Sequence, residues 1–234
     1  MTIVLVHGAG DTARRWRRVQ ELLGPGTVAV DLLGRGTRPY DLTAVTLEAA
    51  AQAAAVDARA ETDGPWVVVA HSAGGIVAPR LVAALGQVSA LVMVAGMCAP
   101  ERARAIDIVD PDRRLGFEEQ RAPLMARYRG CTFVGPGEAD PPAGLSALRD
   151  RRSVQLLDSI VLMYQAVSWV GVAPTTTRTW VRCRRDQIQD PDMQDRLIAA
   201  SGASQVHTLD TGHNPAAEDP VALAALVAEL AQVG

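Results

Sequence analysis

The chain has 234 residues, of which 48% are hydrophobic, 21% charged and only 4% aromatic. This composition excludes intrinsic disorder and collagen-like order, and no apolar run approaches the ~20 residues that a membrane-spanning helix needs. The formal net charge of −3 lacks the basic excess found in nucleic-acid-binding proteins. No lysine occurs, which excludes enzymes that form a lysine Schiff base.

The N-terminus and the cysteines indicate the cellular compartment. A strand-like run begins directly after Met1 and Thr2, without a basic leader or a cleavage site, so we expect no signal peptide and a cytoplasmic location. The cysteines, Cys98, Cys131 and Cys183, form no Cys-x-x-Cys pair, and the four histidines form no His-x-x-x-His pair. We therefore expect reduced thiols, no metal and no cofactor, and the oligomeric state stays open.

Strand-like and helix-like segments alternate along the chain. In chain order we expect a strand at 3–6, a helix at 12–23, strand 27–31, helix 47–62, strand 66–70, helix 75–85, strand 90–95, strand 178–183, helix 191–200, strand 205–209 and helix 215–232. Strands that alternate with helices through short loops require right-handed crossovers and hence a largely parallel sheet. The sequence thus predicts one α/β domain, residues 1–234, of about six mostly parallel strands flanked by helices.

Residues 97–172 interrupt this alternation. They contain helix-like pieces near 111–129 and 154–169, joined by a turn-rich stretch at 135–142. An insertion of this length is too long for a plain loop, so we expect a lid. Its apolar and aromatic side chains are candidates to line a substrate pocket, and the core of the lid is an equally good place for each. They are Met97, Phe117, Met125, Tyr128, Met163, Tyr164 and Trp169.

Residues 70–74 (AHSAG) follow an apolar strand and precede a helix. A sharp turn of this kind lifts a serine hydroxyl above the sheet edge and aims the following backbone N–H groups at the same point. The residues two before and two after Ser72 must be small, because strand and helix crowd there. Ala70 and Gly74 are small, although the usual Gly-x-Ser-x-Gly pattern has glycine at the first of these positions. An ordinary surface serine is the alternative reading.

The first predicted strand ends in a glycine-bearing loop, residues 7–10 (HGAG). In serine-dependent sites of this kind, the second donor to a developing oxyanion lies on such a loop. The backbone N–H groups of Ala9 and Ala73 are therefore the predicted oxyanion donors. We expect His7 and His71 to fix their turns through hydrogen bonds rather than to act as bases.

Two later segments supply partners for the serine. Residues 211–215 (TGHNP) follow the last predicted strand, so His213 should lie above the carboxyl edge of the sheet, beside Ser72. Asp186 comes one short step after the penultimate strand, at the same level. His207 lies inside the last strand and is expected to be a packed or edge side chain.

Three other carboxylates lie near these segments. Asp190 and Asp192 flank Pro191 and are typical of a helix start, where the helix dipole favours acidic residues. Asp210 ends the last strand, and we expect it to cap the loop that carries His213. Asp186 therefore remains the preferred third member of the site.

The order Ser72, Asp186, His213 resembles that of the α/β-hydrolase superfamily, and the resemblance covers almost the whole chain. Within it the sequence looks most like the compact plant-type methylesterase and hydroxynitrile-lyase group, which begins with a VLVHGA strand, carries a lid and needs no cofactor. The resemblance implies that Ser72 is the nucleophile, His213 the general base and then acid, and Asp186 the orienting carboxylate. It also implies that Ala9 and Ala73 donate to the oxyanion.

Two residues separate the branches of that group. Its lyases use a lysine just after the catalytic histidine, where this chain has Asn214, and a hydroxyl-bearing residue where this chain has Ala9. Both differences favour hydrolysis of a small, largely apolar ester through an acyl-enzyme. Two alternatives stay open: a thioesterase or natural-product tailoring hydrolase that uses the same residues, and a receptor-like ligand-binding protein with little turnover.

Overall fold

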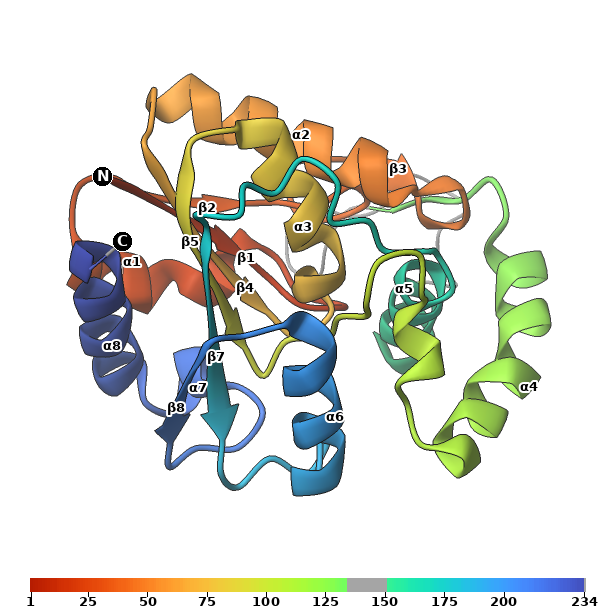
Figure 1. Ribbon diagram of the computed structural model, residues 1–234. Coiled ribbons are helices and arrows are strands. Elements are labelled where there is room, and N and C mark those ends of the chain that lie inside the picture. Colours follow the sequence, from red (N-terminus) through yellow and green to blue (C-terminus); the bar gives the residue numbers. More distant parts are fainter. Residues whose placement is uncertain (134–150, 234) are drawn as a thin grey trace.

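The computed structural model describes residues 1–133 and 151–233 (Figure 1). Six strands form a single sheet in the order β2-β1-β4-β5-β7-β8, and every neighbouring pair is parallel. This confirms the predicted α/β architecture. The strands are β1 (Thr2–Val6), β2 (Thr27–Val30), β4 (Trp66–His71), β5 (Val88–Val94), β7 (Thr177–Cys183) and β8 (Gln205–Leu209).

Helices cover both faces of this sheet (Figure 1). One face packs against α1 (Arg17–Leu23) and α8 (Pro220–Val233), and the other against α2 (Leu47–Glu61), α3 (Gly74–Leu85) and α6 (Pro191–Ser201). Burial on both faces explains why the central strands are apolar without interruption. Along β1, for example, Ile3 and Leu5 belong to one core and Val4 and Val6 to the other.

The edge strand β8, unlike the central strands, is not buried on both faces. Its side chains are exposed or half-buried, because no further strand or helix covers them fully. His207 is half-buried in this strand, which confirms its prediction as an edge side chain.

Two predicted helices are each divided. Residues 12–23 form a short 3-10 helix, η1 (Ala13–Trp16), followed by α1, and the last helix splits into α7 (Pro215–Glu218) and α8. The second break has a local cause: Asp219 precedes a proline and adopts φ −144° and ψ 71°, outside the helical region.

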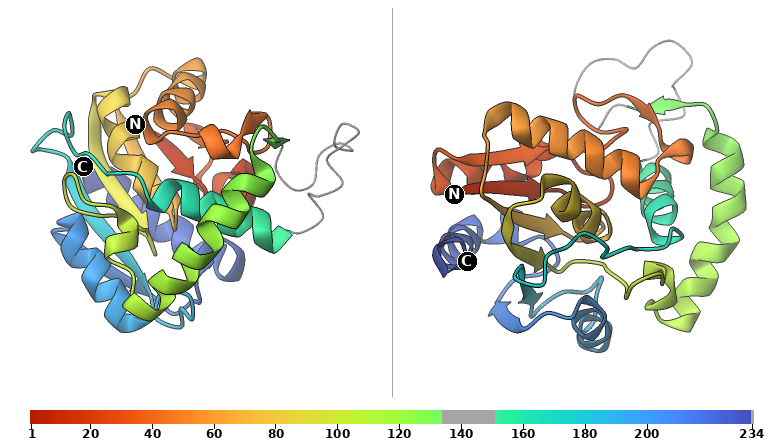
Figure 2. Two further views of the ribbon diagram at one scale, coloured as in Figure 1. Left: turned by 90° about the vertical axis from the view of Figure 1, so that its right-hand side faces the viewer. Right: turned by 45° about the horizontal axis from the view of Figure 1, so that its top comes forward.

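The region between β5 and β7 adds two helices that lie beside the sheet layers, as Figure 2 shows from two further sides. They are α4 (Pro111–Tyr128) and α5 (Arg151–Met163). The second ends earlier than predicted, and just beyond its end the side-chain amide of Gln165 donates hydrogen bonds to the Val161 and Val45 carbonyls at 2.8 and 3.0 Å. The predicted turn-rich stretch at 135–142 lies outside the described residues.

Small elements support these helices. A two-stranded antiparallel sheet joins β3 (Tyr40–Asp41) to β6 (Thr132–Phe133), and two further 3-10 helices, η2 (Leu42–Ala44) and η3 (Ala105–Asp107), pack near α5. Among the described helices, none combines the length and the apolar character of a membrane span.

Candidate active site

Ser72 occupies the sharp turn between β4 and α3. Its φ of +50° lies in the left-handed region, which a non-glycine residue adopts only where the surroundings hold it. The Ser72 N–H donates to the Val94 carbonyl at 3.2 Å, and its own carbonyl accepts from the Gly75 and Met97 N–H groups at 2.9 and 2.8 Å. These three bonds fix the serine at the carboxyl end of the sheet.

The turn has no room for larger residues. A Cβ atom at position 74 would lie 2.5 Å from the His7 carbonyl oxygen, and one at position 8 would lie 2.9 Å from the Ser72 Cβ. Glycine is therefore required at both positions. Ala70 is fully buried and adds only a methyl group, so its difference from the usual glycine leaves the turn intact.

Ser72, His213 and Asp186 form a continuous hydrogen-bonded chain. The His213 ring lies 2.9 Å from the Ser72 Oγ through Nε2 and 2.7 Å from the Asp186 Oδ2 through Nδ1. A carboxylate only accepts, so Nδ1 carries the proton and Nε2 accepts from the serine hydroxyl. The loops after β4, β7 and β8 thus bring together three residues from distant parts of the sequence, as predicted.

Asp186 is held from its other side as well. Its Oδ1 accepts the backbone N–H groups of Ile188 and Gln189 at 2.7 and 2.9 Å, and its side chain is fully buried. Burial alone would raise the pKa of Asp186, but the bonds from His213 and the two amides outweigh it and hold that pKa below its ordinary value. The carboxylate therefore stays charged and orients the imidazole.

Two buried glutamines, which sequence reasoning missed, shape the Asp186 loop. The Gln189 side chain donates to the Ala95 carbonyl at 2.9 Å, which ties the loop to the end of β5. The Gln194 amide bonds both the N–H and the carbonyl of Cys183, at 3.1 and 3.0 Å. Glutamine in a polar stretch carries no sequence signal for such a role, because only the folded loop shows which backbone groups lack partners.

The rival carboxylates lie elsewhere. Asp190 caps α6 and Asp192 is exposed in its first turn, as predicted. The predicted cap by Asp210 is wrong: its exposed carboxylate instead pairs with Arg184 and Arg185 of the neighbouring loop, at 2.9 and 3.1 Å. The parallel pairing of β7 with β8 brings these arginines alongside, and they are stronger partners than a neutral backbone amide.

The rings of His7 and His71 hold neighbouring loops in place through hydrogen bonds to backbone groups, which confirms their predicted role. The His7 ring donates to the Gly8 carbonyl at 2.8 Å and accepts the Leu32 N–H at 3.1 Å, which ties the loop after β1 to the loop after β2. The His71 Nε2 donates to the His213 carbonyl at 2.7 Å. Burial is the main cause that lowers the pKa of each ring to about 4, with a contribution from the nearby His213 in the case of His71, so both are neutral at pH 7.

The predicted oxyanion donors belong to two segments that meet at the Ser72 turn. Ala73 follows it directly and is the N-terminal cap residue of α3, whose dipole favours negative charge at this end. Ala9 lies on the loop that touches the serine through Gly8. Both predicted donors therefore lie on segments that adjoin the serine, and their role stays a prediction.

The predicted pocket residues belong to one apolar cluster. Met97, Tyr128 and Met163 are buried in it, whereas Phe117, Met125, Tyr164 and Trp169 pack against it partly exposed. Met97 also donates its N–H to the Ser72 carbonyl, which places its backbone beside the turn. The Trp169 Nε1 donates to the Ala99 carbonyl at 2.8 Å, which anchors this ring at the base of the insertion.

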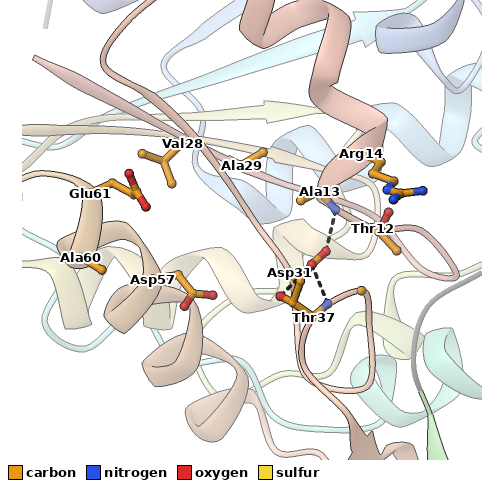
Figure 3. A pocket seen from close by; sticks show the side chains of 11 residues that line it. Thr12, Ala13, Arg14, Val28, Ala29, Asp31, Thr37, Asp57, Ala60 and Glu61 are labelled. Carbon is orange, nitrogen blue, oxygen red and sulfur yellow. Dashed lines mark hydrogen bonds between the residues drawn. The ribbon is translucent and has the colours of Figure 1, made fainter. Parts of the chain in front are cut away.

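A separate cavity of about 400 Å³ lies between β2, η1 and α2 (Figure 3). Two of its three carboxylates are already engaged: Asp31 accepts the N–H groups of Ala13 and Thr37 at 2.7 and 2.9 Å, and Asp57 pairs with Arg38, whereas Glu61 lies exposed at the end of α2. In the described part of the chain, no group of three or more His, Cys, Asp or Glu side chains could hold a metal ion. The Ser72 chain of hydrogen bonds is thus the best candidate site.

Comparison with known sequences gives a consistent result. The model of the Alpha/beta hydrolase family matches residues 3–226. The sequence is also 31% identical to Lipase LipV of Mycobacterium tuberculosis over 211 residues, which cover 89% of this chain and 77% of the lipase. The family match spans the three loops that carry the site.

Solved structures share the fold. The pyrethroid hydrolase PytH superposes with a TM-score of 0.71 at 19% identity, over 99% of this chain and 97% of its own. A methylesterase from Arabidopsis superposes with a TM-score of 0.62 at 17% identity, over 100% of both chains. The occurrence of plant methylesterases among these neighbours confirms the predicted resemblance in fold.

Proposed function

We propose, from the premise that this chain belongs to the alpha/beta hydrolase family, that it is a serine hydrolase acting on a small, largely apolar carboxylic ester. The observation that carries this proposal is the hydrogen-bonded chain from the Ser72 hydroxyl through His213 to the buried Asp186. A serine hydroxyl is a weak nucleophile by itself, and a neutral imidazole in contact with it supplies the missing base.

The reaction then takes two steps. The Ser72 Oγ attacks the ester carbonyl carbon while its proton passes to the His213 Nε2, and the Ala9 and Ala73 N–H groups stabilise the negative oxygen. The alcohol leaves with that proton, and the acyl group stays on Ser72. Water then attacks the acyl-enzyme, gives a proton to His213, and the carboxylic acid leaves as the serine recovers its hydrogen.

The neighbours and the insertion support the proposed substrate class. The similar proteins named above are a lipase, a pyrethroid hydrolase and a methylesterase, which favours an ester here. In this proposal residues 97–172 act as the lid of one domain, and its apolar side chains, Met97 and Met125 among them, line the pocket. The cytoplasmic location stays a prediction from the sequence.

Hydrolysis is preferred to cyanohydrin cleavage. Asn214 takes the place of the lysine expected in lyases of the group, and it is the cap residue of α7. A neutral amide does not hold a cyanide anion as an ammonium group does.

The proposed function predicts a pre-steady-state burst. Wild-type protein is mixed with p-nitrophenyl acetate or butyrate. If deacylation is slower than acylation, p-nitrophenol should appear in a burst whose amplitude equals the enzyme concentration. A fluorophosphonate should label Ser72, which mass spectrometry can detect. Preference for acyl-CoA or acyl-carrier thioesters by orders of magnitude would favour the thioesterase. Labelling at background level would favour the receptor.

Replacement of Asp186 by asparagine should lower kcat by about 10⁴-fold. An asparagine amide can donate to Nδ1, which stabilises the wrong tautomer of His213 and leaves Nε2 unable to accept the serine proton. The measurement is steady-state kcat on p-nitrophenyl butyrate, with the melting temperature as a check of folding.

Matched carboxylate variants control for this assignment. Asp190→Asn and Asp192→Asn should stay within a few-fold of wild type, because neither side chain reaches the imidazole. Asp210→Asn removes only exposed ion pairs, so its kcat and stability should change little. Loss of turnover in a folded Asp210→Asn variant, with Asp186→Asn still active, would require another acid.

A further inference from the structure

A buried ion pair joins α5 to the loop after β2. Arg35 contacts Asp158 twice, through Nε at 3.1 Å and through Nη2, and its Nη1 donates to the Gly34 carbonyl at 2.7 Å. Only 2% of Arg35 and 7% of Asp158 is exposed. Burial lowers the pKa of Arg35 to about 9, so the guanidinium is still charged at neutral pH.

The same carboxylate also holds the loop after β1. The Asp158 Oδ2 accepts the Gly10 N–H at 2.7 Å, a charge-assisted bond to the loop that carries Ala9. Gly10 has φ +68°, and a Cβ at this position would lie 2.8 Å from the Gln155 Cβ. The loop is therefore pressed against α5, with one of its N–H groups bonded to a fixed anion.

Such a pair is a poor way to gain stability. Removing two charges from water is costly, and apolar residues of similar volume often stabilise a protein equally well or better. The carboxylate does provide one thing that an apolar pair cannot, an acceptor for the Gly10 amide. Arg35 in turn balances the charge of that acceptor through two contacts.

We propose that Asp158, whose charge Arg35 balances, is a positioning residue that accepts the Gly10 N–H and so sets the loop 7–10 with the Ala9 N–H pointing at the developing oxyanion. This inference rests on the proposed function. In this inference, α5, a helix of the insertion, helps to position the loop that stabilises the oxyanion. Loss of the acceptor should then affect the transition state more than substrate binding, because the oxyanion forms only during the reaction.

Two double variants isolate the acceptor. Arg35→Met with Asp158→Leu removes both charges and the acceptor, whereas Arg35→Met with Asp158→Asn removes both charges and keeps a side-chain oxygen for Gly10. Neither leaves a lone buried charge, and leucine and asparagine have the same number and branching of side-chain heavy atoms. We expect kcat to fall about 100-fold in the leucine variant with KM little changed, the scale of a misplaced catalytic group, and to stay within a few-fold of wild type in the asparagine variant.

Hydrogen exchange of residues 8–12 gives a readout independent of turnover. Amides of this loop should exchange faster in the leucine variant than in the asparagine variant at equal melting temperature. Equal kcat and equal exchange in both variants would overturn the inference. Absence of turnover in wild type would instead overturn the proposed function, and the exchange comparison would still decide whether Asp158 holds the loop. If the leucine variant does not fold, Arg35→Met with Asp158→Ala replaces it as the acceptor-free arm, and kcat and exchange equal to those of the asparagine variant would again overturn the inference.

Discussion

Replacing Ser72 with alanine is expected to lower kcat by about 10⁶-fold while leaving the fold unchanged, the scale found when a triad nucleophile is removed. The loss is large because the hydroxyl oxygen forms the covalent bond, and no neighbouring group takes its place. The fold should survive because the Ser72 backbone makes the bonds that hold the turn, and Ala95 already adopts φ +41° in this chain.

The measurement is a burst assay with a p-nitrophenyl ester, with circular dichroism and melting temperature to verify folding. Ser204→Ala is the matched control. This serine is exposed, and its hydroxyl and its backbone N–H both donate to the Arg178 carbonyl, at 3.3 and 2.9 Å. It should retain wild-type turnover. A folded Ser72→Ala protein that kept more than a few per cent of wild-type kcat would disprove the nucleophile assignment.

His213→Ala is expected to lower kcat by a similar factor, about 10⁶-fold, because removal of the base costs as much as removal of the nucleophile when the two act as a unit. The variant also deprives the buried Asp186 carboxylate of a donor, which should cost about 1–3 kcal/mol of stability. The two backbone amides that still bond this carboxylate should keep the loop in place.

Fluorophosphonate labelling checks this result independently of substrate choice. Labelling of Ser72 should slow in parallel with turnover, since the reagent also needs an activated hydroxyl. His207→Ala is the control, because that ring lies half-buried on the edge strand, and it should label at the wild-type rate. Labelling of His213→Ala at the wild-type rate would show that another group activates the serine.

The sequence by itself determined the sheet and the turn that carries Ser72. Central strands buried on both faces must be apolar throughout, so runs such as residues 66–70 are visible without any knowledge of their partners. The turn is also visible in the sequence, because the small residue Gly74 stands at a fixed spacing after Ser72. The contact that requires it, with the His7 carbonyl oxygen, exists only in the fold. The approximate positions of His213 and Asp186 follow from the same rule, because both come just after strands of one parallel sheet.

Only the tertiary structure decided what each polar group meets. Asp210 lies three residues before His213, yet it pairs with Arg184 and Arg185, because the strand pairing sets these loops side by side. The contact between Arg35 and Asp158 joins residues 123 positions apart and depends on how α5 packs against the sheet. Apolar burial is nearly independent of the partner, so sequence pattern predicts it; a hydrogen bond requires one donor and one acceptor within about 3 Å, and that distance exists only after the elements have packed.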